Sequence, residues 1–148
     1  MYKARVIAEW FVQRAARDVN KGGDFLTQLK LQKLLYYAQG FYMAFNDGKK
    51  LFKDSIIHMQ YGPVVKSLIP ILKNYSNNPI PTLNFEIPDL DEYTLGILNL
   101  VYDKLGQYSA YKLVELTHAE GPWKNTTQGQ EILAVDIYNF IKEHYTKQ

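Results

Sequence analysis

Side chains of the types that carry catalysis or bind metal ions are few in this sequence of 148 residues, and they are widely spaced. The three histidines, His58, His118 and His144, stand far apart, and none belongs to a His-x-x-x-His pair that would place two ligands on one helix face. The chain has no cysteine, so disulfides, thiolate nucleophiles and cysteine-ligated zinc are excluded. We therefore expect no metal site and no bound cofactor.

Two short patterns resemble catalytic or phosphate-binding motifs, and both have simpler explanations. Ser109-x-x-Lys112 matches the nucleophile pattern of penicillin-binding enzymes, but the Ser-Asp-Asn and Lys-Thr-Gly partners are absent and the chain is far too short for that fold. A helix cap explains Ser109 better. The Gly22–Gly23 pair is too short to surround a phosphate, and no Gly-x-x-x-x-Gly-Lys loop occurs. We therefore predict that the protein is not an enzyme.

The composition is that of an ordinary globular protein, with 47% hydrophobic and 22% charged residues. A chain of this length corresponds to one domain, so we expect residues 1–148 to form a single folding unit. The longest apolar stretches end well short of the roughly 18 residues that a membrane span needs. The N-terminus lacks the apolar run and cleavage site of a signal peptide, and we expect a cytoplasmic protein without membrane contact.

The charges are unevenly distributed along the chain. Residues 1–75 contain 12 Lys and Arg against 5 Asp and Glu, whereas residues 76–148 contain 5 against 10. A basic surface attracts nucleic acid or an acidic protein, although chance differences between solvated helix faces would give the same pattern. No Arg-rich run, zinc-finger spacing or aromatic RNA-binding signature is present, so we do not expect nucleic acid as the partner.

Helical patterns cover most of the chain and must provide the framework for any binding surface. Apolar residues recur at intervals of three and four, which is typical of helices with one buried face. Thr27 or Asp24, Asp91 or Asp89, and Ser109 are predicted to cap helices at their N-termini. The predicted long or medium helices cover residues 3–19, 27–45, 89–105, 110–118 and 131–144.

The second of these helices carries the widest apolar stripe and is predicted to be the central helix of the core. A wide stripe indicates burial on more than one side. Gly40 would allow another helix to approach closely. The residues assigned to the core are Leu31, Leu34, Leu35, Ala38 and Phe41, and those assigned to the flanks, as supporting or partner-binding residues, are Lys30, Gln32, Lys33, Tyr36 and Gln39.

The segment between residues 49 and 80 is the least regular. Residues 56–60 are compatible with a short strand, and Pro63 is well placed as the first residue of a helix that runs to about Tyr75. Pro70 should kink or split that helix. Together these patterns predict an all-α or mainly α fold of six to eight helices, with at most a minor β-hairpin near residues 52–60 or 82–88.

Three blocks of sequence resemble the Panacea antitoxin domain, a family that includes SocA-like and phage-associated GepA-like proteins. They are "LTQLKLQKLLYYAQGFYMAF", "GKKLFKDSIIHMQYGPVVKSL" and "LVELTHAEGPW", and they occur in the order and at about the spacing of the family. The most specific parts are residues 30–40, residues 61–65, and Thr117-His118 with Pro122-Trp123. The sequence departs from the family at two places. Met59 and Gln60 occupy the positions before the Tyr-Gly-Pro turn where family members often have a tryptophan, and Lys66 occupies a position where proline is common.

The resemblance implies a type II antitoxin that neutralises a toxin encoded beside it. Family members inhibit by direct binding or, as in the SocA case, act as an adaptor that delivers the toxin to the ClpXP protease. The alternative is a phage-derived nucleic-acid-binding regulator or a small enzyme with an unrecognised site. The candidate partner-binding residues are Lys30, Gln32, Lys33, Tyr36, Gln39, Tyr61, Lys66, His118 and Trp123, although internal packing is an alternative role for each; the oligomeric state and the toxin stay open.

Overall fold

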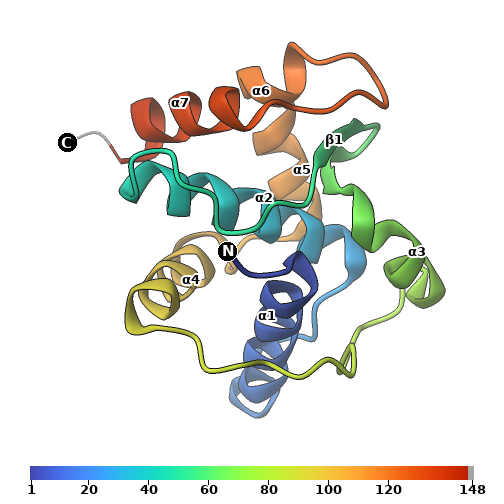
Figure 1. Cartoon of the computed structure of the whole chain (residues 1–148). Coiled ribbons are helices and arrows are strands. Elements are labelled where there is room, and N and C mark those ends of the chain that lie inside the picture. The colour runs from blue at the N-terminus through green and yellow to red at the C-terminus, as the bar shows by residue number, and fades with distance from the viewer. Residues whose placement is uncertain (147–148) are drawn as a thin grey trace.

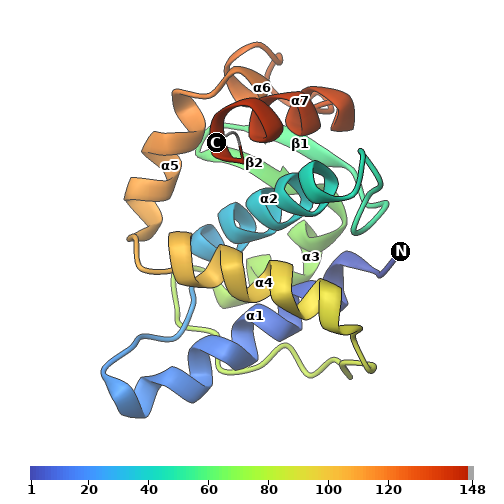
Figure 2. The same ribbon diagram turned by 90° about the vertical axis from the view of Figure 1, so that its left-hand side faces the viewer.

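Helix α2, Gln28–Phe45, lies at the centre of the fold in a computed structural model that describes residues 1–146 (Figures 1 and 2). Other helices and a hairpin surround it, and its buried side chains point to both sides. Four helices contact it: α1 (Ala4–Asp18), α4 (Glu92–Leu105), α5 (Ala110–His118) and α7 (Ala134–Tyr145). The prediction that this segment is the central helix is confirmed.

The other described elements are short. Strands β1 (Ile56–Met59) and β2 (Gly62–Val65) form an antiparallel hairpin that packs on α2. The remaining helical segments are η1 (Val19–Lys21), η2 (Lys66–Leu68), α3 (Ile69–Leu72), η3 (Lys73–Tyr75) and α6 (Gly121–Lys124). Residues 1–146 thus contain seven α-helices and one small sheet, which confirms the mainly α prediction. No helix in this part of the chain is long and apolar enough to cross a membrane.

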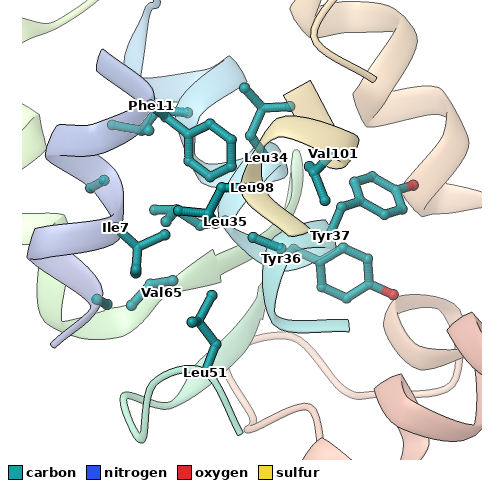
Figure 3. Packing of buried hydrophobic residues seen from close by; sticks show 14 of the residues in the cluster. Ile7, Phe11, Leu34, Leu35, Tyr36, Tyr37, Leu51, Val65, Leu98 and Val101 are labelled. Atoms are coloured by element: carbon teal, nitrogen blue, oxygen red, sulfur yellow. The ribbon is translucent and has the colours of Figure 1, made fainter. Parts of the chain in front are cut away.

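The core forms on both sides of α2. Leu34 and Leu35 pack with residues from α1 and α4, as Figure 3 shows. Tyr36 and Tyr37 are fully buried, and their rings meet edge to face with centroids 5.0 Å apart. The five residues assigned to the core, Leu31, Leu34, Leu35, Ala38 and Phe41, are all buried, so this prediction is confirmed.

The prediction of a helix from Pro63 is wrong, because residues 62–65 form strand β2. His58 pairs with Pro63 and Ile57 with Val64 across the hairpin. Proline is tolerated there because β2 is an edge strand, where a missing N–H breaks no ladder bond. The helical pattern applies only after Val65, where η2, α3 and η3 follow one another and Pro70 occupies the first turn of α3.

The last helix starts later than predicted. Residues 129–132 pair with β1 instead, through bonds from the His58 amide to the Gln130 carbonyl (2.9 Å) and from the Ile132 amide to the Ile56 carbonyl (2.8 Å). They bond to β1 beside the hairpin without forming a regular strand, and α7 begins only at Ala134. Two of the three predicted caps are confirmed, whereas Thr27 at the start of α2 makes no capping side-chain hydrogen bond. Asp91 accepts a bond from the Thr94 amide at 2.7 Å, and Ser109 accepts one from the Lys112 amide at 3.1 Å.

The long connection between α3 and α4 is fastened to α1 by a buried carboxylate. Glu9 is 0% exposed and accepts hydrogen bonds from the Thr82 hydroxyl (2.8 Å), the Leu83 amide (2.9 Å) and the Phe85 amide (3.3 Å). These bonds satisfy backbone groups that have no sheet or helix partner, so a segment without regular structure can follow α1 closely (Figure 1).

Gly40 allows α2 and α7 to approach, as predicted from the sequence. A Cβ atom at this position would lie 2.5 Å from Ile141 Cγ1 and 3.2 Å from Ile137 Cγ2. Contacts this short require a shift of the packed helix, since both isoleucines are buried.

We therefore expect Gly40→Ala to lower the free energy of unfolding by about 1–3 kcal/mol, as overpacking does in other cores. Gly96→Ala in α4 is the matched control, because nothing lies within 4 Å of its added methyl group. That variant should gain about 0.5–1 kcal/mol from helix propensity. Urea unfolding of both variants measures the difference. Equal effects of the two substitutions would contradict the close approach at Gly40.

Candidate partner-binding surface

Gln32 and Gln39 lie two turns apart on α2 and hold neighbouring backbone segments. The Gln32 side chain accepts a bond from the Val65 amide (2.8 Å) and donates one to the Val65 carbonyl (3.3 Å). Gln39 accepts from the Leu51 and Phe52 amides (2.8 and 3.2 Å) and donates to the Phe52 carbonyl (2.7 Å). Both side chains are buried, so each amide group does for these segments what a neighbouring strand would do.

Lys33 is the most unusual side chain of the same helix, because it is a lysine that is 0% exposed. Its ammonium nitrogen donates to the Pro63 carbonyl at 3.1 Å. Burial lowers the pKa of Lys33 to about 7. The Lys33 side chain packs against Gly62, which has a φ of +113°. A Cβ atom at Gly62 would lie 2.6 Å from Lys33 Cε, so a larger residue would not fit beside the lysine.

A groove with a volume of about 640 Å³ opens beside Lys33, between the start of α2, the hairpin, α3 and α5. We call it the hairpin groove. About half of its lining residues are apolar or aromatic, among them Met59, Val64, Ile69 and two exposed tyrosines, and the others are glutamine, asparagine and lysine. Tyr61 is 55% exposed at the hairpin turn and Tyr111 is 74% exposed on α5. Large exposed aromatic side chains beside an apolar groove are typical of a protein-binding surface.

Trp123 belongs to α6 and connects this short helix to the hairpin and to α5. Its indole lies between the rings of His58 and His118, with centroid distances of 4.1 and 3.9 Å and interplanar angles of 13° and 18°. The indole N–H donates to the Met59 carbonyl at 2.8 Å. His118 stacks on the indole, and its buried Nε2 has no hydrogen-bond partner among the described residues.

A second buried ionisable cluster surrounds Glu120, between α5 and α6. The Tyr37 hydroxyl donates to Glu120 Oε2 at 2.9 Å, and the Tyr145 hydroxyl donates to the same oxygen. Burial raises the pKa of Glu120 to about 7, against the opposing effect of the tyrosine hydrogen bonds. The Tyr36 hydroxyl is close to this carboxyl group but makes no hydrogen bond of normal geometry with it.

Comparison with protein-family models matches residues 31–124 to the antitoxin SocA-like Panacea domain. This stretch is more than half of the chain and includes Lys33, both strands, Glu120 and Trp123. The chain belongs to the SocA-like Panacea antitoxin family. Neither the comparison with curated proteins nor that with solved structures gave a match.

The Panacea motifs supply both buried and exposed members of the candidate set. Lys66 and Tyr61 are exposed, and Lys30, His118 and Trp123 are partly exposed. The Lys30 ammonium donates to the Gly106 carbonyl at 2.5 Å. The buried candidates are Gln32, Lys33, Tyr36 and Gln39.

Two residues of these sites were not predicted from the sequence. Tyr111 has the spacing of a solvated helix face, and only its place among the residues that line the groove marks it. Glu120 precedes a Gly-Pro turn, where an acidic residue is normally solvated. Among residues 1–146, no group of three or more histidines and carboxylates is placed to hold a metal ion.

The two buried ionisable groups predict a minimum of stability near pH 7. Glu120 has its pKa raised from 4.5 to about 7, so between these values the folded state keeps a proton that the unfolded chain has lost, and stability falls as the pH rises. Lys33 has its pKa lowered from 10.5 to about 7, so between these values the folded state has lost a proton that the unfolded chain keeps, and stability rises with pH.

Urea unfolding at pH 5, 7 and 9 tests this dependence, with a slope of at most about 1.4 kcal/mol per pH unit from each group. We expect Glu120→Gln to remove the fall below pH 7 and Lys33→Met to remove the rise above it. If neither variant alters its own limb of the profile, the two groups are not held in the protonation states described above.

Proposed function

We propose that this protein is the antitoxin of a type II toxin–antitoxin system and that it neutralises a toxin encoded beside it by binding the toxin directly. The observation that carries this proposal is the family match over residues 31–124. The surface is compatible with a stoichiometric binding role, because two exposed tyrosines and several apolar side chains line the hairpin groove. Tyrosine buries a large area at a small entropic cost and keeps a hydroxyl for hydrogen bonding.

Tyr61 and Tyr111 are the proposed anchors of the contact. Their side chains are 55% and 74% exposed, so their removal should cost the folded protein little. Exposed lysines on the same half of the chain are proposed to attract an acidic patch of the toxin. Lys49, Lys50, Lys53 and Lys66 are among the exposed ones, whereas Lys33 is buried and Lys30 is engaged with Gly106.

We expect Tyr61→Ala and Tyr111→Ala to abolish protection in cells that co-express the neighbouring toxin gene, with almost no change in melting temperature. Val135→Ala is the matched control, since Val135 is also 55% exposed but lies at the start of α7 and does not line the groove. Survival assays and thermal unfolding of the three variants give the answer. Loss of protection that always accompanies loss of folding would place the contact surface elsewhere.

The same assay in cells without ClpXP separates the two modes of neutralisation. Direct binding should protect equally well with and without the protease, and the purified complex should form at a fixed stoichiometry. Protection that requires ClpXP would identify an adaptor and would contradict inhibition by binding alone.

The exposed lysines are expected to affect the rate of association with the toxin. Reversing the charges of Lys49, Lys50 and Lys53 to Glu should slow association with the toxin, and the effect should grow as the ionic strength is lowered. Stopped-flow or surface-based association rates at two salt concentrations measure this effect. A salt-independent loss would show that these side chains contribute short-range contacts and do not steer the encounter.

A further inference from the structure

We propose that an aromatic patch at one end of the molecule binds an arginine side chain of a partner protein. The patch consists of the side chains of Tyr2, Tyr42, Tyr93 and Asp91, and we call it the tyrosine patch. None of these residues lines the hairpin groove, so this inference goes beyond the proposed function and adds a second contact surface. Figure 2 shows the N-terminus, the end of α2 and the start of α4 on the same side of the molecule.

Hydrogen bonds and ring contacts hold the tyrosine patch together. The Tyr2 hydroxyl donates to Asp91 Oδ2 at 3.2 Å and accepts a bond from the Asp91 amide at 3.4 Å. The rings of Tyr42 and Tyr93 meet edge to face, with centroids 6.1 Å apart. Burial raises the pKa of Tyr42 and the Asp91 carboxylate raises it further, because this carboxylate lies close to the Tyr42 hydroxyl. The patch therefore combines three aromatic rings with one carboxylate.

The tyrosine patch is open to solvent. Tyr93 is 49% exposed, Asp91 is also exposed, and Tyr2 and Tyr42 are half-buried. Phe45 lies three residues after Tyr42 on α2 and is therefore its neighbour on the helix surface. It is 46% exposed, and its carbonyl accepts a bond from the Tyr93 hydroxyl at 2.8 Å. Large exposed aromatic side chains gathered in one place are typical of a surface that contacts another protein.

The carboxylate of the patch is charged and has no cationic partner. Asp91 accepts bonds from the Thr94 amide at 2.7 Å and from the Tyr2 hydroxyl. These bonds hold the pKa of Asp91 below its usual value, so the group is negative at neutral pH. No ion pair among residues 1–146 includes Asp91. A carboxylate offers about four acceptor positions, so this one can accept further hydrogen bonds.

The protein itself pairs an arginine with the same combination of groups. The Arg14 guanidinium lies over the Tyr102 ring, 4.6 Å from its centroid, and donates to the Asp103 carboxylate at 3.2 Å. The tyrosine patch offers rings and a carboxylate without an arginine beside them. A planar guanidinium can stack on a ring and bond to a carboxylate at the same time, which a compact ammonium group does less well. We therefore assign arginine to the site.

A peptide titration tests the site directly. Acetyl-Leu-Arg-Leu-amide is the probe, and acetyl-Leu-citrulline-Leu-amide, of the same shape but without charge, is the matched control. Protein labelled with ¹³C-tyrosine allows the ring signals of the patch to be followed by NMR; Tyr2→Phe, Tyr42→Phe and Tyr93→Phe assign them. The arginine peptide should shift these signals saturably, with a Kd of about 10 mM or lower. The citrulline peptide should bind about fivefold more weakly or not at all.

Equal responses to the two peptides, or no saturable shift with the arginine peptide up to about 20 mM, would overturn the proposal. Free L-arginine distinguishes a protein partner from a small molecule. It should bind about fivefold more weakly than the peptide, because it lacks the leucines that can contact exposed aromatic side chains such as Phe45. Equal Kd values for the peptide and the free amino acid would overturn the assignment to a protein partner.

Two variants test the role of the carboxylate. Asp91→Asn removes the charge but leaves α4 capped, since Asn and Asp cap helices about equally well, so the melting temperature should change little. It should weaken binding of the arginine peptide by about fivefold or more. Glu115→Gln makes the same change of net charge at an exposed position of α5, on the opposite side in Figure 2, and should leave the Kd unchanged within about twofold. Equal weakening by both variants would refute the site; the antitoxin proposal is tested separately at Tyr61 and Tyr111.

Discussion

The structure depends on one constraint: a helix enclosed on all sides must satisfy its polar groups inside the protein. Helix α2 carries Gln32, Lys33 and Gln39 into the interior, and each of them bonds to backbone atoms of residues 51–65. Unpaired, such groups would cost about 1–3 kcal/mol each, and a charged one more. Their pairing fixes where the hairpin and the loop before it lie, and the hairpin in turn forms one wall of the groove.

The parts of the fold that could be predicted from the sequence are those that local periodicity determines. The apolar stripe of residues 31–41 identified the central helix, and the side chains of Asp91 and Ser109 identified two helix starts. The start of α7 and strand β2 could not be found in this way. Both depend on pairing with β1 across the chain, and the β-branched residues of β2 fit a helix pattern equally well when read alone.

The candidate site likewise depends on contacts between distant parts of the chain, which local periodicity does not reveal. Lysine and glutamine on the flank of a helix normally indicate solvent, and nothing in their residue types reveals that Gln32, Lys33 and Gln39 are buried here. Their partners, the backbone atoms of Pro63, Val65 and Phe52, leave no trace in residue type. Glu120 and Tyr37 come together for a similar reason, because the contact joins positions 83 residues apart. The C-terminal helix lies outside the matched family region, yet Tyr145 completes this cluster and Ile141 fits against Gly40.

The way in which α2 covers strand β2 has a consequence for how a second protein can attach to the hairpin. An edge strand normally offers free amides and carbonyls to which another chain can add as a further strand. Here Gln32 occupies both backbone groups of Val65, Lys33 occupies the Pro63 carbonyl, and proline has no amide hydrogen to offer. Strand addition is therefore blocked on this side. The hairpin is protected from sheet-type aggregation, and selectivity for a ligand on this face must come from side chains.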